Sequence, residues 1–128
     1  MRLFRHGPAG REKPGAFAAD GTMRDLSSLV DDLGEATLGP ADLDRLRAAD
    51  LSALPAVEAA TRLGPCVARP SKIVCIGLNY VDHAEEAGMA KPQEPIFFLK
   101  APSAYCGPND AVRLPRGAEK GDWEVELG

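Results

Sequence analysis

Two acidic side chains near the end of the sequence have the spacing of ligands for a divalent cation. Glu124 and Glu126 alternate with apolar residues across Asp122–Gly128, and in an extended strand residues two positions apart point to the same side. Their charges repel unless a cation or solvent lies between them. Carboxylate oxygens favour Mg²⁺ or Mn²⁺; the alternative is an amphipathic strand with its acidic side in water. Asp122 shares this parity, but it follows a Lys-Gly pair, so we assign it to a turn.

A histidine and a glutamate further upstream could provide a general base. His83 and Glu86 are three residues apart, so on a helix they lie on one face within contact range. A carboxylate beside an imidazole fixes its tautomer and raises its basicity. The positive end of a helix dipole favours the neutral imidazole, which is the form that accepts a proton. The alternative is an exposed helix face on which both side chains are simply solvated.

A third candidate is Lys100, which ends the otherwise apolar segment Pro95–Lys100. Strand parity places it on the same side as Ile96 and Phe98. A lysine that continues an apolar face either extends to solvent at the rim or holds an anion in a pocket. Both interpretations stay open.

These candidates lie in the second half of the chain, where the signals for secondary structure are clear. Lys72–Gly77 is continuous and rich in β-branched residues, which is typical of a strand buried on both faces. The elements expected after it are a helix capped by Asn79 and ended by Gly88, a strand over Pro95–Lys100, a turn at Gly107–Asp110 and a strand over Ala111–Leu114.

The first half, residues 1–65, predicts a small α+β unit, so we divide the chain into residues 1–65 and 66–128. Its expected elements are a strand at Arg2–Arg5, two strands at Gly15–Ala19 and Met23–Leu26 around an Asp-Gly turn, and a short helix from Pro40 to Arg47. Residues 51–70 are rich in Pro, Gly and Ala, which predicts a linker with one short strand near Cys66–Arg69.

Charge and composition exclude several classes of protein. The 128 residues carry 15 Lys and Arg against 19 Asp and Glu, a net charge of −4, so nucleic acid is not an expected partner. The apolar runs are too short to span a bilayer, and the first residues lack the apolar region of a signal peptide. Cys66, Cys75 and Cys106 cannot all pair within one chain, so we expect inert small hydrophobic residues in a reducing cytoplasm.

Four segments, taken in order, resemble the fumarylacetoacetate hydrolase family. They are KIVCIGLNYVDHAEE at 72–86, PIFFLK at 95–100, CGPND at 106–110 and DWEVELG at 122–128. The resemblance covers residues 71–128 and is specific. The first 65 residues are similar to the small N-terminal domain of one bacterial branch, which includes ureidoglycolate lyases, dienedioate isomerases and hydrolases of diketo-deoxy sugar acids.

The resemblance implies a mixed β-roll, usually a homodimer, that holds Mg²⁺ or Mn²⁺ with three acidic residues. Two of these match Glu124 and Glu126, and the third would follow on a later strand. The family's His–Glu dyad, carried on a short helix that covers substrate, matches His83 and Glu86, and its active-site lysine matches Lys100. Because the sequence stops within a predicted strand, we expect a truncated roll.

The function that follows is metal-dependent hydrolysis of a carbon–carbon bond in a 2,4-dioxo acid, with water activated by the histidine. The acylpyruvate-cleaving branch of the family has a Gly-Arg-Asn-Tyr motif, and the resemblance implies that its arginine helps to hold substrate. At the matching position this chain has Leu78. Ureidoglycolate lyase or dienedioate isomerase and decarboxylase activity on the same scaffold therefore remains an alternative. A catalytically inactive fragment with an exposed sheet edge is a further one.

Overall fold

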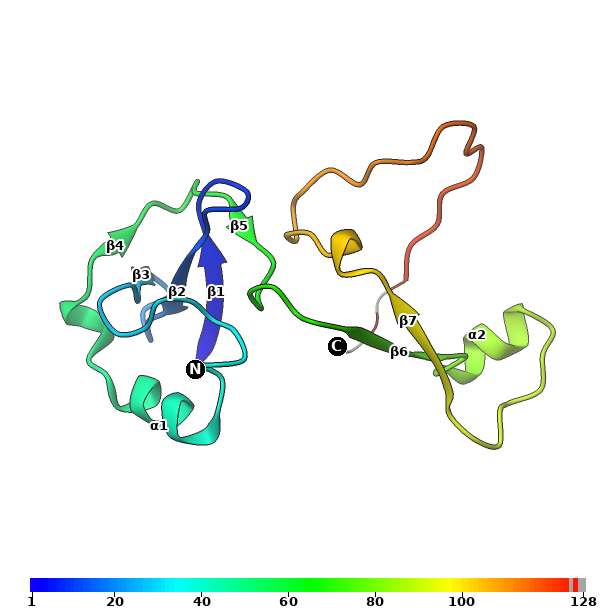
Figure 1. Ribbon diagram of the computed structural model, residues 1–128, viewed down its shortest axis with the longest axis horizontal. Helices are drawn as coiled ribbons and strands as arrows, with labels where there is room; N and C mark the ends of the chain where they lie inside the picture. The colour runs from blue at the N-terminus through cyan, green and yellow to red at the C-terminus, as the bar shows by residue number, and fades with distance from the viewer. Residues whose placement is uncertain (125, 127–128) are drawn as a thin grey trace.

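The computed structural model describes residues 1–124 and residue 126. A five-stranded sheet with one helix forms the N-terminal part, and a long two-stranded hairpin with a second helix forms the other (Figure 1). Both sheets are antiparallel. The predicted α+β class is confirmed.

The N-terminal sheet has the strand order β4-β3-β2-β1-β5. Its strands are β1 (Arg2–His6), β2 (Lys13–Phe17), β3 (Met23–Asp25), β4 (Ala56–Val57) and β5 (Leu63–Gly64). The β2–β3 connection confirms the predicted turn, since Gly21 has a φ of +84° and the Asp20 carboxylate accepts the Thr22 N–H at 2.9 Å. A positive φ suits glycine, which has no Cβ to clash.

One face of this sheet packs against α1 (Pro40–Ala48), in agreement with the predicted helix, and against the chain that leads to it. A proline in the first turn fits the helix start because its missing N–H would have no partner there. Leu26, Leu33 and Leu46 are almost completely buried and form the centre of this core. A 3₁₀ turn, η1 (Leu51–Ala53), follows the helix.

The opposite face carries a row of aromatic side chains from β1 and β2. The Phe4 ring lies 4.8 Å from the Phe17 ring and 5.7 Å from the His6 ring, centroid to centroid. Gly15 pairs with Phe4 across the strands, and a Cβ on Gly15 would come within 2.3 Å of that ring. Glycine is therefore required for the phenylalanine to lie flat on the sheet.

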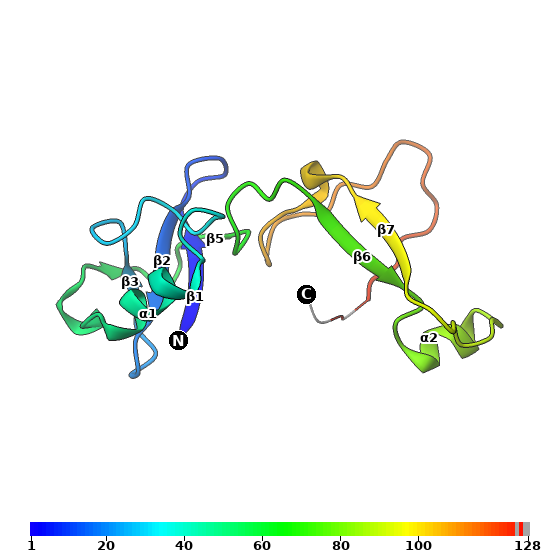
Figure 2. The same cartoon turned by 60° about the horizontal axis from the view of Figure 1, so that its bottom comes forward.

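The hairpin consists of β6 (Ile73–Gly77) and β7 (Ile96–Lys100), with α2 (Val81–Glu86) at the end remote from the N-terminal sheet (Figure 2). Both strands were predicted, but the expected burial of the first on both faces is wrong for this chain. No residue of β6 is fully buried, and its Val74 is 57% exposed. Among the described residues, β6 pairs only with β7, so nothing completes the layers that a buried strand needs.

Three further predictions are corrected. Residues 66–69 form no strand, because Arg69 takes a φ of +42° and the Ala68 N–H binds Leu33 O at 2.6 Å. Ala111–Leu114 also has no strand, since the described residues offer it no partner. Asn79 does not cap α2, where Tyr80 is the N-cap and makes no side-chain capping bond. The predicted turn at Gly107–Asp110 is confirmed by an N–H to O bond of 3.2 Å.

A second 3₁₀ turn, η2 (Pro102–Ala104), follows β7, and the chain then returns toward β5 (Figure 1). Within the part of the chain that is described, neither α-helix has the length and apolar character needed to cross a bilayer.

Candidate functional site

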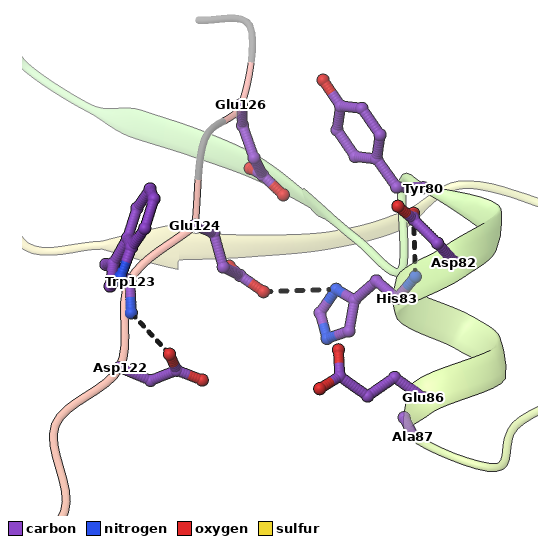
Figure 3. A pocket seen from close by; sticks show the side chains of 9 residues that line it. All are labelled: Tyr80, Asp82, His83, Glu86, Ala87, Asp122, Trp123, Glu124 and Glu126. Carbon is purple, nitrogen blue, oxygen red and sulfur yellow. Dashed lines mark hydrogen bonds and ion pairs between the residues drawn. The ribbon is translucent and has the colours of Figure 1, made fainter.

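An open hollow of about 550 Å³ lies between α2 and the acidic segment near residue 124 (Figure 3). Polar and aromatic side chains from both sides line it. They are Tyr80, Asp82, His83, Glu86, Asp122, Trp123, Glu124 and Glu126, together with Ala87. The hollow therefore brings together four of the five candidate site residues, which come from two distant stretches of sequence.

The ends of α2 determine where its two functional side chains lie. The helix starts directly after β6 and a tight turn in which Leu78 has a φ of +49°. It ends at Gly88, which has a φ of +65°, and the Met89 N–H bonds to Ala84 O at 2.8 Å across that glycine. This is the usual glycine-based helix stop. The C-terminal end of the helix is thus capped, and its His83 side faces the acidic segment (Figure 3).

One ion pair in the hollow joins the two stretches of sequence. His83 Nδ1 lies 3.3 Å from Glu124 Oε1, and the two side chains are 40% and 53% exposed. Glu86 lines the same hollow, but within the described chain no hydrogen bond joins it to His83. The carboxylate that approaches the imidazole is therefore Glu124, whereas spacing along the helix pointed to Glu86.

Lys100 lies in an adjoining hollow of about 580 Å³, which shares Asp122, Trp123, Glu124 and Glu126 with the first. Its Nζ is 5.7 Å from the centre of the Phe98 ring, which confirms the predicted strand parity. The ammonium group thus lies on the hairpin face that the acidic segment crosses. A cationic group beside two carboxylates can balance their charge or that of an anionic ligand.

The two carboxylates offer the chemistry of a hard cation site but not a full set of ligands. Glu124 and Glu126 both line the two hollows, as their predicted common side requires. Residues 125, 127 and 128 of the strand predicted there lie outside the described residues, and residues 122–124 and 126 form no strand. Across the residues described, no group of three or more His, Cys, Asp or Glu could hold a metal ion.

The cysteines differ from the sequence prediction in one respect. All three are free, but Cys66 and Cys106 are exposed and only Cys75 is partly buried. Cys66 Sγ lies 3.2 Å from the Tyr105 hydroxyl, which also accepts the Val67 N–H at 3.1 Å. Two of the three are therefore surface residues and not buried hydrophobic ones.

The sequence analysis missed several residues that line the hollow. Tyr80 and Trp123 flank it and are 40% and 79% exposed, and Asp122, assigned to a turn, also lines it. The position of Tyr80 at the start of the predicted helix was a usable signal, since the residue at a helix start borders whatever the helix faces. Trp123 offered none, because its parity assigned it to the opposite side of the predicted strand.

Comparison with known proteins relates the second half of the chain to one enzyme family. Residues 72–128 match the family model described as "Fumarylacetoacetate (FAA) hydrolase C-terminal". The match includes α2, both hairpin strands and the acidic segment, and so contains the whole candidate site.

Relatives and one solved structure extend the similarity to the first half. A Burkholderia ambifaria protein is 55% identical and a Burkholderia cenocepacia protein 53% identical over all 128 residues; their names assign them provisionally as hydrolases. The chain spans 45% of the length of each. A crystal structure of a Mycobacterium smegmatis protein, provisionally named an HpcE protein, matches with 28% sequence identity and a TM-score of 0.62. The match covers 91% of this chain and 42% of the M. smegmatis chain. These findings support a relationship to the fumarylacetoacetate hydrolase family.

Proposed function

We propose that the chain belongs to the fumarylacetoacetate hydrolase family and contributes part of an enzyme that hydrolyses a carbon–carbon bond in a 2,4-dioxo acid. The observation that carries the proposal is the approach of His83 to Glu124 across a hollow that Glu86 and Glu126 also line. An imidazole and several carboxylates gathered around one open hollow suit general-base chemistry beside a cation.

The chain's own residues have distinct roles in this mechanism. His83 accepts a proton from the water that attacks the C4 carbonyl of the substrate. Glu124 contacts its imidazole across the hollow, and Glu86, on the same helix face, is assigned to orient it as the family resemblance implies. The carbon–carbon bond then breaks, and its electron pair remains on the pyruvate part as an enolate. Lys100 balances negative charge on the substrate or on the developing oxyanion.

Glu124 and Glu126 would hold the cation, Mg²⁺ or Mn²⁺, because both present carboxylate oxygens to the same hollow. When bound, the cation would supply Lewis-acid stabilisation to the acid and 2-oxo oxygens of the substrate. The set is incomplete among the described residues, so we expect weak affinity in this chain and assign the third carboxylate to a later strand of a longer protein.

The proposal extends to fold, assembly and location. The β6–β7 hairpin would be the start of a mixed β-roll that follows a separate N-terminal domain of residues 1–65, and the complete protein would be a homodimer in the reducing cytoplasm. Exposed apolar side chains on the hairpin support this view, since a completed roll would cover them.

A second group of reactions rests on the residue between β6 and α2. Leu78 carries no charge to hold a substrate carboxylate, and its φ of +49° is unusual for a branched side chain. Lyase action on ureidoglycolate, or isomerisation and decarboxylation of a dienedioate, uses the same stabilised enolate-type charge. These reactions are therefore the alternative, together with a chain that has no activity by itself.

The test combines cation binding with turnover. Calorimetry with Mn²⁺ should give a weak binding isotherm that Glu124→Ala abolishes and that the control Glu119→Ala, outside both hollows, preserves. Turnover assays with fumarylpyruvate, a diketo-deoxy sugar acid and ureidoglycolate run in parallel distinguish the reactions.

Loss of turnover in His83→Ala, with full turnover in Glu85→Ala on the same helix, is the expected result for the general base. Full turnover in His83→Ala would contradict the assigned role. Cation binding that Glu124→Ala leaves unchanged would contradict the ligand assignment. Absence of both binding and turnover in the unaltered chain would favour the inactive alternative.

A further inference from the structure

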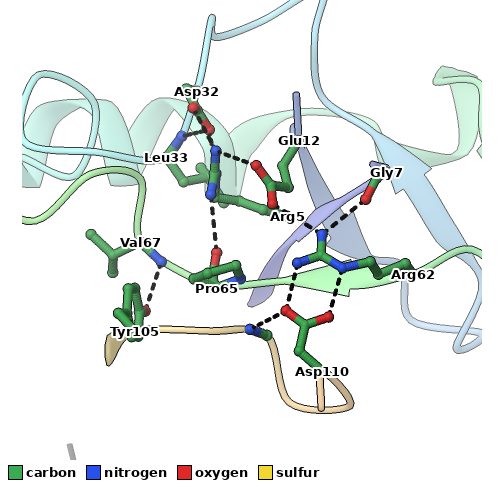
Figure 4. A network of polar contacts seen from close by, with 11 residues as sticks. Arg5, Gly7, Glu12, Asp32, Leu33, Arg62, Pro65, Val67, Tyr105 and Asp110 are labelled. Carbon is green, nitrogen blue, oxygen red and sulfur yellow. Dashed lines mark hydrogen bonds and ion pairs between the residues drawn. The ribbon is translucent and has the colours of Figure 1, made fainter. Parts of the chain in front are cut away.

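A line of alternating charges connects the N-terminal sheet to the segment that follows β7 (Figure 4). Asp32 pairs with Arg5, Arg5 with Glu12, Glu12 with Arg62, and Arg62 with Asp110. The line starts beside the core of the N-terminal sheet and ends on a residue 48 positions beyond Arg62. The hydrolase chemistry proposed above uses none of these residues.

Arg62 lies at the centre of the contact between the two parts. Its Nε and Nη2 donate to the two Asp110 carboxylate oxygens at 2.7 and 2.6 Å, in a bidentate arrangement. Its Nη1 donates to Gly7 O and to Glu12 Oε1, both at 3.0 Å. Arg62 and Asp110 are 29% and 23% exposed, and Glu12 only 7%. A partly buried, bidentate arginine–carboxylate pair is geometrically specific and stronger than a surface contact.

Two neighbouring residues hold the same segment by different means. The Tyr105 hydroxyl accepts the Val67 N–H at 3.1 Å. Gly107 packs against β5 so closely that a Cβ would lie 2.3 Å from Leu63 O, and its N–H donates to Asp110 Oδ2 at 2.7 Å. Residues 105–110 thus contact β5 at Leu63, the preceding residue Arg62 and the following connector at Val67.

The covalent connection between the two parts is short and irregular. Residues 65–72 join β5 to β6 without secondary structure, and Arg69 within them has a φ of +42°. Two units joined by one connector and a small interface are expected to reorient relative to each other. A second attachment at residues 105–110 closes a loop that runs through the hairpin and removes that freedom.

We propose that the Arg62–Asp110 pair is a latch that fixes the β6–β7 hairpin against the N-terminal sheet. The latched segment follows β7 and η2 directly, so the pair fixes the end of the hairpin. Arg62 and the Gly107 N–H hold the pKa of Asp110 below its usual 3.8, so the latch stays charged at any higher pH. The inference concerns orientation and stands apart from the proposed reaction.

Asp110→Ala tests the latch, because residue 110 lies outside every strand and its loss leaves the N-terminal core intact. In the unaltered chain, ¹⁵N relaxation should give one rotational correlation time for residues 2–64 and 73–100. In the variant the two parts should show different and shorter times. The matched control, Asp44→Ala, removes the partner of the exposed Arg47 on α1 and should change neither.

Hydrogen exchange supplies a second readout. The amides of residues 105 and 110 donate to Pro102 O at 3.1 Å and to Gly107 O at 3.2 Å. They should exchange at least about tenfold faster in Asp110→Ala, because the segment loses a hydrogen bond to a charged group. The amides of β1 and β2 should be unchanged. Uniform acceleration along the whole chain would assign the pair to global stability and overturn the latch.

Gly107→Ala provides an independent variant that keeps both charges. Its new methyl group would meet the Leu63 backbone oxygen, so it should release the segment and give the same separated correlation times. Gly39→Ala is the control, since its Cβ would meet only the Asp42 carboxylate at an ordinary 3.7 Å. A single correlation time in both Asp110→Ala and Gly107→Ala would rule the latch out.

Discussion

The N-terminal sheet and the β6–β7 hairpin are built from similar antiparallel pairs but differ in what covers them. β1 is flanked by two strands and has three buried residues out of five, whereas all five residues of β7 are exposed. The first part has a core of leucines below α1. The second has well-paired backbones and bare apolar side chains within the described chain.

This difference separates two contributions to a β-structure. Pairing and register in a hairpin follow from local signals, such as β-branched runs, breaking residues and strand parity. Burial requires residues far away in sequence to cover the strand. The hairpin demonstrates that pairing can be specified while burial is not, and its free energy should therefore depend little on its apolar side chains.

The largest expected difference in the free energy of unfolding is between two leucine-to-alanine substitutions, one in each part of the chain. Leu33→Ala in the core should lower the free energy of unfolding by about 2–5 kcal/mol, through lost burial and the cavity left behind. Leu99→Ala, at a position 69% exposed, should change it by less than about 0.5 kcal/mol. Urea denaturation followed by far-UV circular dichroism is the measurement, because the single tryptophan, Trp123, is 79% exposed and does not sense the core.

A similar cost for both substitutions would break the comparison. It would mean that the hairpin face around Leu99 is buried in solution. Leu33 is almost completely buried, so a cost below about 1 kcal/mol for Leu33→Ala would contradict the core assignment.

The ion pairs allow the same comparison for charges. Asp32 accepts from Arg5 Nε at 2.6 Å and from Nη2 at 2.9 Å, and the Arg5 side chain is only 8% exposed. Asp32→Ala leaves that guanidinium with Glu12 at 3.5 Å and the Pro65 carbonyl oxygen at 3.3 Å. It should cost about 3 kcal/mol, as expected for a buried charge that loses its closest partner. Asp44→Ala, which breaks an exposed pair with Arg47, should cost no more than about 0.5 kcal/mol. Equal costs in the same denaturation experiment would contradict the difference in burial.

A smaller effect should appear in the pH dependence of stability. Burial lowers the pKa of His6 below its usual 6.5, and this outweighs the raising effect of Asp25, whose carboxylate lies 3.6 Å away. The unfolded chain then binds the proton more readily than the folded one. The contribution of the neutral His6 to stability is therefore fully present above pH 6.5 and is lost as the pH falls below that value.

His6→Gln should flatten that slope, measured as the urea midpoint between pH 7 and pH 5. The matched control is His83→Gln, which replaces the other histidine of the chain, on α2 and outside the N-terminal sheet. A slope that His83→Gln removes and His6→Gln preserves would assign the pH dependence to the hairpin.

The sequence predicted most elements because their signals are local. The Asp-Gly turn, Pro40 at the start of α1 and the β-branched run of β6 each determine their own neighbourhood. The predictions of a buried β6 and of a strand at Ala111–Leu114 were wrong, since both features depend on partners that the described chain does not provide. The strand predicted at residues 66–69 was wrong for a related reason. Distant groups, Leu33 and Tyr105, bind the backbone of these residues.

The candidate site shows the same limit. Spacing along one helix placed His83 and Glu86 on one face, and both do line the hollow. Helix periodicity carries no information about a partner from another element, so the approach of Glu124 to His83 required the structure. The Arg62–Asp110 pair was missed for that reason also, since nothing near either residue marks it as one of a pair.

The smallest expected change in stability is for Phe97, the most exposed large hydrophobic residue of the two hairpin strands. Phe97 is 70% exposed and shares a face with Val74 and Leu99, so Phe97→Lys should change the free energy of unfolding by less than about 0.5 kcal/mol. The same substitution should clearly reduce binding of an apolar fluorescent dye and any self-association seen by sedimentation, because it places a charge within the exposed apolar patch. Phe17→Lys, on the aromatic row of the N-terminal sheet, should instead be destabilising, since its ring packs on Phe4. Dye binding that Phe97→Lys does not alter would mean that the bare hairpin face is not the apolar surface the chain presents to water.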